Sequence, residues 1–442
     1  MSRHSVAVVG AGWAGLAAAV DLVSRDFDVT VLEAAAEPGG RARALGFDGS
    51  TLDNGQHLLL GAYGETLKKM RQVGAAPQRL LERRPLSWVV EGPDERFELN
   101  LPRAPAPVAV PWGFLRARDF SLRDRLRALA SVPRLRAPPR RDCDVATWLD
   151  RCGQPAAVQR ALWAPLCLAA LNAPPERASA RVLARVLDEA FRRYGAADLL
   201  LPRVDLGGLF PRPARDWLAR HGAQLQFTTR VRSLEPQGRG WRVNAGDATR
   251  DVDHVVLATG ARATARLLPD DPGSRALAER LQALGHAPIT TVYLRYPPDV
   301  SLPVPMVGRL DGPGQWIFDR RLTGQDGVMA VVISGDGEHM QWPRERVADA
   351  VQAQLAAAYP HWPAPRARAV VREKRATFDC VPGCDQHRVH TRGPCAGLWF
   401  AGDHVATGLP ATIEGAVRAG VQCARELAME AAPLKNRELF NE

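Results

Sequence analysis

Long apolar runs and the features of an exported protein are missing from this chain of 442 residues. The nearest candidate for a membrane span, residues 163–171, is half of the about 18 apolar residues that a spanning helix needs. An apolar strand pattern begins within five residues of the first methionine, so we expect no signal peptide. Seven cysteines, an odd number spread over the chain, do not suggest a disulfide framework. We therefore expect a cytoplasmic protein with reduced thiols.

The sequence also has no recognisable metal motif. One cluster combines Cys380, Cys384, His387, His390 and Cys395, but its spacing matches no zinc pattern. We expect these residues to lie in loops and predict no metal site.

Lysine is scarce, and the net charge of +10 comes almost entirely from arginine. The segment 112–141 has an aromatic and apolar start, and nine arginines but only two aspartates lie between Arg116 and Arg141. Ser121 and Asp124 have the spacing of a capping box, and leucines recur at helical spacing from Leu122. This pattern predicts a basic amphipathic helix. The helix either packs its apolar stripe into the core or contacts an anionic membrane surface; nucleic acid is disfavoured because no aromatic platform or known binding module accompanies the charge.

A dinucleotide-binding motif opens the chain. The apolar run 6–9 leads into Gly10, Gly12 and Gly15, spaced as G-x-G-x-x-G, and Trp13 and Ala14 begin a helix-forming stretch. A second apolar run, 29–32, ends in an acidic residue, Glu33, eighteen positions after Gly15. This order of strand, glycine turn, helix, strand and acid is typical of a βαβ unit that binds a dinucleotide.

Each position of this motif has a physical role. Gly10 allows a tight turn, Gly12 lets the backbone approach a pyrophosphate, and Gly15 lets the helix lie close to the sheet. Glu33 is expected to accept hydrogen bonds from ribose hydroxyls, which disfavours the 2′-phosphate of NADP.

Further apolar runs predict that nucleotide-type segments return after an insertion. Strands are expected near 224–227, 241–243, 253–260, 290–296, 328–333 and 397–403, and helices at 143–153 and 178–194. After the Gly402-Asp403 strand end, a helix is expected from Pro410 because proline suits a first helical turn. Its small residues would let its N-terminus approach the electron-rich edge of a ligand. The pattern predicts an α/β protein: a Rossmann-like nucleotide domain with an inserted mixed-sheet and helical domain.

The motifs resemble those of the flavin-containing amine oxidase and phytoene desaturase superfamily from end to end. The resemblance rests on the opening motif, on residues 37–43, on Ala258-Thr259-Gly260, on Ala401-Gly402-Asp403 and on residues 410–416. Within that superfamily, residues 53–57 and 407–412 resemble the bacterial hydroxysqualene dehydroxylases, also called squalene-associated FAD-dependent desaturases.

The resemblance implies FAD, with the three motif glycines at its pyrophosphate and Glu33 at the adenosine ribose. It implies that Arg41 neutralises phosphate charge, Arg43 lies nearer the isoalloxazine, Val231 contacts adenine, and Asp403 binds the ribityl or pyrophosphate region. The helix from Ala411, itself an expected cofactor contact, would face the flavin pyrimidine ring and stabilise the reduced anion. Other expected cofactor contacts are Trp13, Ala14, Gly39, Gly40, Asn54, Gly55, Gln56, His57, Gly260, Gly402, Pro410, Thr412 and Ile413. Residues 405–409 contain neither the Cys nor the Tyr of covalent monoamine oxidases, so noncovalent flavin is expected.

The implied reaction is reductive removal of the hydroxyl of hydroxysqualene, giving squalene and water in squalene and hopanoid biosynthesis. Breaking the carbon–oxygen bond needs a proton donor, and the resulting cation needs a hydride. His57 is our candidate near that event, either as acid or as a structural hydrogen-bonding residue. Only one dinucleotide motif is visible, so NAD(P)H or another reductant would bind transiently. A C30 isoprenoid substrate also favours peripheral contact of segment 112–141 with an anionic inner membrane.

The resemblance also sets the expected domains. Residues 1–85, 204–285 and 385–442 would form the FAD-binding domain, and residues 86–203 and 286–384 the substrate domain. Three alternatives stay open: a phytoene-desaturase-like enzyme, an amine oxidase, and a nonenzymatic module of the same architecture that binds prenylated proteins. The oligomeric state is not predicted.

Overall fold

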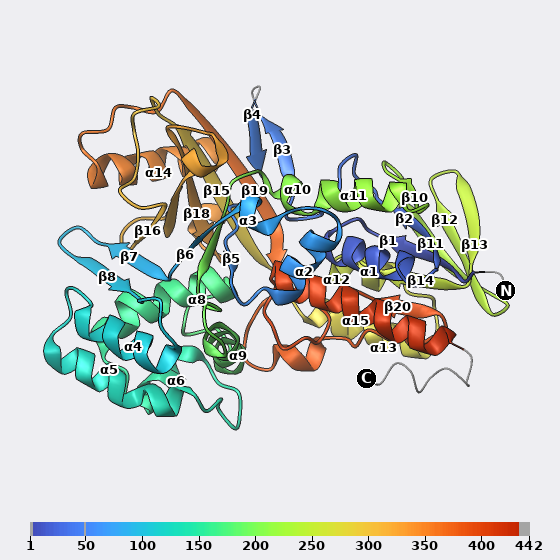
Figure 1. Ribbon diagram of the computed structural model, residues 1–442, viewed down its shortest axis with the longest axis horizontal. Coiled ribbons are helices and arrows are strands. Elements are labelled where there is room, and N and C mark those ends of the chain that lie inside the picture. The colour runs from blue at the N-terminus through green and yellow to red at the C-terminus, as the bar shows by residue number, and fades with distance from the viewer. Residues whose placement is uncertain (1–2, 48–49, 433–442) are drawn as a thin grey trace.

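A five-stranded parallel sheet lies at the centre of one half of the molecule, in a computed structural model that describes residues 3–47 and 50–432 (Figure 1). Its strand order is β10 (Gln224–Gln226), β2 (Asp28–Leu32), β1 (Ser5–Val9), β14 (His254–Leu257) and β20 (Leu398–Phe400). The register places Ala7 opposite Thr30 on one side and Val255 on the other. These strands are nearly continuous apolar runs because a parallel sheet is covered on both faces.

Two helices cross closely over this sheet. The helix α1 (Trp13–Val23) starts at the glycine motif, and α15 (Ile413–Ala431) lies against it (Figure 1). Gly420 makes this approach possible, since a Cβ atom there would lie 2.2 Å from the Ala14 carbonyl oxygen. Helix α11 (Pro211–Arg220) also packs on α1, and a small antiparallel sheet of β11 (Val231–Gln237), β12 (Gly240–Ala245) and β13 (Ala248–Val252) contacts β1 and β14.

A second, seven-stranded mixed sheet forms the other half. Its order is β19 (Ala367–Thr377), β15 (Ala287–Arg295), β18 (Val328–Ser334), β17 (Trp316–Asp319), β16 (Met306–Arg309), β7 (Ser87–Glu91) and β8 (Arg96–Asn100). Helix α14 (Arg344–Ala358) covers one face through Val347, Val351 and Leu355.

A group of helices contains α4 (Ala106–Arg116), α5 (Leu122–Leu135), α6 (Val145–Cys152), α7 (Ala156–Val158), the π-helix η1 (Gln159–Trp163), α8 (Ala164–Leu171) and α9 (Ala180–Phe191). It extends from the middle of the molecule, at α8 and α9, to the end away from the β11–β13 sheet, where α4, α5 and α6 lie (Figure 1). The remaining elements are β3 (Ala44–Phe47), β4 (Ser50–Asp53), β5 (Leu59–Leu60), α2 (Gly64–Gln72), α3 (Pro77–Leu80), β6 (Leu81–Arg84), β9 (Leu199–Pro202), α10 (Leu206–Leu209), α12 (Ala261–Leu267), α13 (Pro272–Ala283) and the 3-10 turns η2 (Arg320–Thr323), η3 (Glu338–Met340) and η4 (Cys384–His387).

The predicted α/β class is confirmed, and each predicted strand overlaps an observed one. The predicted helix start at Pro410 is wrong: α15 begins three residues later, because the Thr412 hydroxyl caps it by accepting from the Gly415 N–H.

The prediction for segment 112–141 needs correction as well. The aromatic start is itself a helix, α4, in spite of Pro111, and the Ser121 hydroxyl caps α5 as expected. The leucine stripe does not enter the core as one face, since Leu122 and Leu126 are 65% and 53% exposed.

Candidate functional site

One large cavity of about 1630 Å³ joins the carboxyl ends of the parallel strands to helices α4 and α5. Its volume exceeds the roughly 300–1,000 Å³ of a pocket for one drug-sized ligand. The predicted site residues that line it are Gly10, Gly12, Trp13, Ala14, Glu33, Gly39, Gly40, Arg41, Asn54, Gly55, Gln56, His57, Val231, Gly260, Gly402, Asp403, Pro410, Ala411, Thr412 and Ile413. The tertiary structure therefore brings together residues that are up to 403 positions apart.

Two glycine-rich loops form the nucleotide end of this cavity. The Gly39 N–H donates to the Ala11 carbonyl oxygen at 2.8 Å, and a Cβ on Gly40 would lie 3.2 Å from the Gly12 Cα. Gly10, Gly39 and Gly40 have positive φ angles, which glycine adopts without strain. The pair of loops is a shallow backbone cradle that side chains would fill.

The N-terminus of α1 opens into this cradle. Gly12 is its N-cap, no side chain caps it, and its first turn holds no acidic residue. The first backbone N–H groups of a helix have no partners within the helix and carry partial positive charge. This end of the cavity therefore fits a phosphate-bearing group.

Glu33 supports the first loop and faces the cavity. Its carboxylate accepts from the Ala11 N–H at 2.7 Å and from the Ala35 N–H at 2.8 Å. A carboxylate has about four acceptor positions, so two remain for ribose hydroxyls. The predicted ribose role is compatible with this geometry.

Arg41 and Asp403 form an ion pair in the middle of the cavity wall. The Arg41 Nη2 donates to Asp403 Oδ1 at 2.6 Å, and Nη1 donates to the Ala376 carbonyl oxygen at 2.8 Å. Burial alone would raise the pKa of Asp403, but the charge and hydrogen bond of Arg41 together with those of His404 outweigh it and hold this pKa well below its usual range. Asp403 is therefore a carboxylate at neutral pH.

A buried ion pair fixes the loop of residues 53–57. Arg320 Nη1 donates to Asp53 Oδ2 at 2.9 Å and to Gln56 Oε1 at 2.8 Å, and the Tyr293 hydroxyl donates to the Asp53 carbonyl oxygen at 2.8 Å. Both charged side chains of the pair are almost fully buried. The backbone that carries His57 is thereby held rigidly.

His57 lies on this loop at the cavity wall. Its Nδ1 atom is 2.9 Å from the Gly55 carbonyl oxygen, so the Nδ1–H tautomer satisfies that carbonyl and leaves Nε2 as an acceptor. Burial lowers the pKa of His57, which keeps the ring neutral at pH 7. This electrostatic state favours a hydrogen-bonding role over that of a charged acid.

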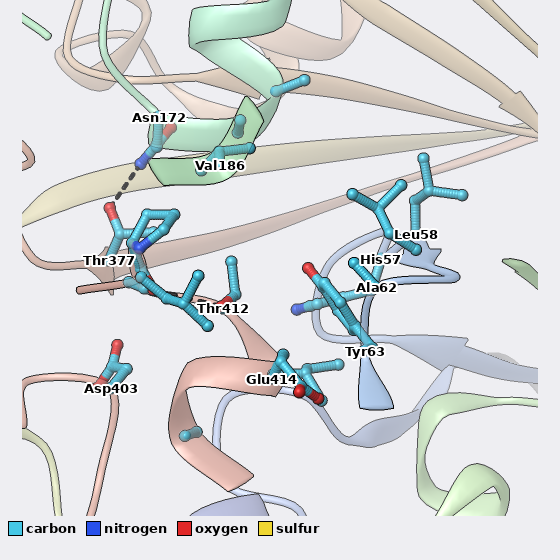
Figure 2. A pocket seen from close by; sticks show the side chains of 18 of the residues that line it. His57, Leu58, Ala62, Tyr63, Asn172, Val186, Thr377, Asp403, Thr412 and Glu414 are labelled. Atoms are coloured by element: carbon cyan, nitrogen blue, oxygen red, sulfur yellow. Dashed lines mark hydrogen bonds between the residues drawn. The ribbon is translucent and has the colours of Figure 1, made fainter. Parts of the chain in front are cut away.

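The start of α15 holds the opposite wall together. The buried Glu414 carboxylate accepts from the Glu65 and Thr66 N–H groups, at 3.1 and 3.0 Å, and from the Arg418 Nε at 2.8 Å. These contacts anchor the first turn of α2, whose N-cap is Tyr63. Figure 2 shows Tyr63 between His57 and Glu414, with its hydroxyl directed into the cavity.

Two predicted residues do not reach the cavity lining. Gly15 serves packing instead, because a Cβ there would lie 2.0 Å from the Gly10 carbonyl oxygen. The Arg43 guanidinium donates to the Gly40 carbonyl oxygen and supports the second loop.

Several lining residues were not predicted from the sequence. Tyr63, Glu189 and Arg418 line the cavity, and Arg418 pairs with Glu189 at 3.0 Å. Asn172, at the end of α8, connects this helix to strand β19 by donating to the Thr377 hydroxyl at 3.0 Å (Figure 2). No motif marks these residues, although Tyr63 follows His57 by only six positions.

Beyond the nucleotide end the cavity is lined mainly by apolar side chains. They come from the seven-stranded sheet, from the helices and from the segment around β5: Leu58, Leu60, Trp88, Leu99, Val110, Phe114, Leu129, Val132, Leu162, Trp163, Leu166, Phe191, Met306, Trp316, Phe318 and Val332. An elongated hydrocarbon is the ligand that such a lining favours.

Within the described residues, no three His, Cys, Asp or Glu side chains are arranged to hold a metal ion, and no helix has the length and apolar character to cross a membrane. All seven cysteines are free thiols.

A comparison with models of known protein families gives a match that fits a nucleotide-binding cavity. The model of the family described as flavin containing amine oxidoreductase matches residues 13–428. The chain belongs to this family, and it is an FAD-dependent oxidoreductase.

The chain is also similar to individual proteins of known sequence or structure. The chain is 32% identical to the hydroxysqualene dehydroxylase of Rhodopseudomonas palustris, over 95% of this chain and 97% of that protein. It is 31% identical to the hydroxysqualene dehydroxylase of Sinorhizobium fredii, with the same coverage. The crystal structure of a protein described as a putative protoporphyrinogen oxidase, from Exiguobacterium sp. 255-15, shares the fold with a TM-score of 0.75 at 16% identity, covering 97% of this chain and all of that one.

Proposed function

We propose that this protein removes the hydroxyl group of hydroxysqualene reductively and releases squalene and water. The carrying observation is a single cavity that runs from a dinucleotide cradle into a large apolar chamber. The names of the two relatives above support the same substrate. An FAD that lies in the cradle, when reduced, supplies a hydride.

The residues of the chain would position the nucleotide and exclude water from the substrate. The α1 N-terminus and Glu33 would hold the nucleotide, and Thr412 at the start of α15, which lines the same cavity, would contact the flavin ring. The apolar lining excludes water, which protects a carbocation from side reactions. We propose the predicted domains on the same basis, with the cradle in the FAD-binding domain and the chamber in the substrate domain.

The test is anaerobic incubation of dithionite-reduced, flavin-loaded protein with hydroxysqualene, followed by mass analysis. We expect squalene in proportion to the reduced protein, and none from the oxidised protein. Absence of squalene, with turnover of an amine or a carotenoid precursor instead, would refute the proposed reaction.

We also propose noncovalent flavin and a transiently bound reductant such as NAD(P)H. No cysteine is among the described residues that line the cavity. Acid precipitation should therefore release all flavin into the supernatant, and flavin that stays with the precipitate would contradict this part.

We further propose that the outer faces of α4 and α5 contact an anionic membrane. This α4–α5 surface consists of Val108, Trp112, Leu115, Leu122 and Leu126, whose exposed fractions range from 46% to 65%. Apart from Tyr194, they are the large exposed apolar side chains of the described chain.

Charge and position on the α4–α5 surface support lipid as the partner. Arg116, Arg123 and Arg127 lie on the same helices and form no ion pair with a carboxylate of the described chain. The inner faces of both helices line the cavity through Val110 and Leu129, so a hydrocarbon would pass only one helix layer between bilayer and chamber.

Flotation with vesicles tests this contact. Binding to anionic vesicles should fall when Arg116, Arg123 and Arg127 become glutamine, because each arginine near the surface contributes about 1 kcal/mol. Arg125 is spared since it donates to the Phe120 and Leu115 carbonyl oxygens.

The matched control removes the same charge elsewhere, at Arg71, Arg220 and Arg239, which are exposed on other elements. Equal losses in both triple variants would show a nonspecific charge effect, and no binding by the wild type would refute the contact.

A further inference from the structure

We propose that Tyr63 and His57 form a donor–acceptor pair that holds the substrate hydroxyl, and that Tyr63 gives the proton when this hydroxyl leaves. This inference rests on the proposed function for its substrate. Both side chains line the cavity, six residues apart in the chain, and Figure 2 shows them next to each other near Thr412.

The position of Tyr63 is set by contacts that leave its hydroxyl in the cavity. Tyr63 is the N-cap of α2, and the first N–H groups of that helix are bound to the Glu414 carboxylate. The backbone that carries Tyr63 is therefore held against the start of α15. Burial, and then the nearby Glu414 charge, raise the pKa of Tyr63 far above its ordinary value. The phenol keeps its proton at every physiological pH.

The hydrogen of the Tyr63 hydroxyl is available for donation. The Thr412 hydroxyl accepts from the Gly415 N–H at 3.1 Å and donates to the Pro410 carbonyl oxygen at 3.3 Å, so it has no hydrogen left to donate to Tyr63. In the contact between the two hydroxyl groups Tyr63 is therefore the donor. A substrate oxygen in the cavity would replace Thr412 as the acceptor of this O–H.

His57 supplies the complementary acceptor. Its Nδ1–H is taken by Gly55, and Nε2 has no hydrogen-bond partner among the described residues. A substrate alcohol both donates and accepts one hydrogen bond, which matches an Nε2 acceptor beside a phenol donor.

Three other polar side chains of the wall are already committed to protein partners. The Asn172 side-chain amide donates to the Pro288 carbonyl oxygen and to the Thr377 hydroxyl. The hydrogen bond from Arg418 lowers the pKa of Glu189, so that side chain has no proton to give. Glu414 accepts from backbone groups and from Arg418 and is likewise a poor donor.

Atoms and charge balance in the proposed removal of the hydroxyl group. As the carbon–oxygen bond breaks with its electron pair on oxygen, the Tyr63 proton joins that oxygen to form water. The carbon would be neutralised by the hydride that a bound, reduced flavin can supply. Tyr63 then regains a proton from solvent. Even a phenol of raised pKa gives its proton to a departing hydroxide favourably, because the pKa of water is about 15.7.

Binding to the oxidised protein tests the pair without turnover. Perturbation of the flavin absorption band gives the affinities for hydroxysqualene and squalene, and the ratio reports recognition of the hydroxyl. Tyr63→Phe and His57→Leu should each lower this ratio about tenfold, the effect of one hydrogen bond of roughly 1.4 kcal/mol, while affinity for squalene stays unchanged.

Tyr296→Phe is the matched control, because Tyr296 is buried in the core beside α14 and does not line the cavity. An unchanged ratio in Tyr63→Phe would overturn the pairing. This result is distinct from failure of the proposed reaction, in which the wild type would make no squalene at all.

A single-turnover experiment tests the proton. With hydroxysqualene, reduced Tyr63→Phe should react about 10²- to 10⁴-fold more slowly than the wild type, the usual contribution of general acid catalysis. With the acetate ester of the same alcohol the deficit should largely disappear, because acetate leaves without a proton. An equal deficit with both substrates would assign Tyr63 a structural role and overturn the proposal.

Discussion

The contact between α1 and α15 yields a prediction in which two effects of opposite sign compete. Gly420 lies inside α15, where replacement of glycine by alanine ordinarily stabilises a helix by about 1 kcal/mol. Here the new Cβ would lie 2.2 Å from the Ala14 carbonyl oxygen and 3.1 Å from the Ala18 nitrogen. An ordinary contact needs about 3.4 Å or more, and backbone atoms cannot move aside as a side chain can. The two helices would have to separate by about an ångström.

We expect Gly420→Ala to lower the free energy of unfolding by about 1–2 kcal/mol. Overpacking of this kind costs about 1–3 kcal/mol, its upper range applies to a backbone clash, and the gain in helix propensity offsets about 1 kcal/mol. Because α1 begins at the cradle and α15 at the opposite wall, flavin affinity should fall together with stability.

The assay is urea unfolding of flavin-loaded protein, followed by tryptophan fluorescence and by the fluorescence of released flavin. Gly64→Ala is the control, since its Cβ would meet only the end of Arg193, at 3.9 Å. If Gly420→Ala is as stable as the wild type and retains its flavin, the close contact between the helices limits neither the stability of the fold nor flavin binding.

Three further predictions follow from the charged and titratable groups. Asp53→Asn should destabilise the protein by about 3–5 kcal/mol in urea unfolding because it leaves the buried Arg320 charge unpaired; a cost below 1 kcal/mol, the range of an exposed pair, would refute this. The low pKa of Asp403 implies stability that is present above the unfolded pKa of about 3.9 and is lost as the pH falls below it. Below about pH 4 the wild type should therefore lose roughly 1.4 kcal/mol per pH unit more than Asp403→Asn, and parallel pH profiles in acid denaturation would contradict the assignment. Since burial lowers the pKa of His57, the affinity for hydroxysqualene should be constant from pH 7 to 9, and a change across this range in Tyr63-intact protein would show that His57 titrates there.

The helices and strands of the nucleotide half could be predicted from the sequence because residues close together in the chain specify them. The strands β1, β2, β14 and β20 are apolar runs bounded by glycine or acid, and the caps of α5 and α6 are short-range hydrogen bonds. The spacing of Gly10, Gly12 and Glu33 likewise reflects one turn and one helix. Their roles toward FAD are still predictions, but their convergence on one cavity is observed.

The sequence was less informative wherever a long-range contact decided the outcome. The start of α15 depends on the Thr412 cap, and the positions of Tyr63 and α2 depend on Glu414, some 350 residues away. No periodicity shows that Arg320 would be buried against Asp53. The apolar stripe of α5 was ambiguous for the same reason, because hydrophobicity alone does not show whether a leucine meets the core, a cavity or lipid.

The sequence alone determined the class of the fold, the nucleotide motif and the family, because each depends on residues that act over one strand, one turn or one helix. Only the tertiary structure decided that these segments enclose one cavity, that a phenol and an imidazole share its wall, and that arginine and apolar side chains lie together outside it. Those relations depend on the mutual placement of distant segments by packing and buried charge, which no local spacing encodes.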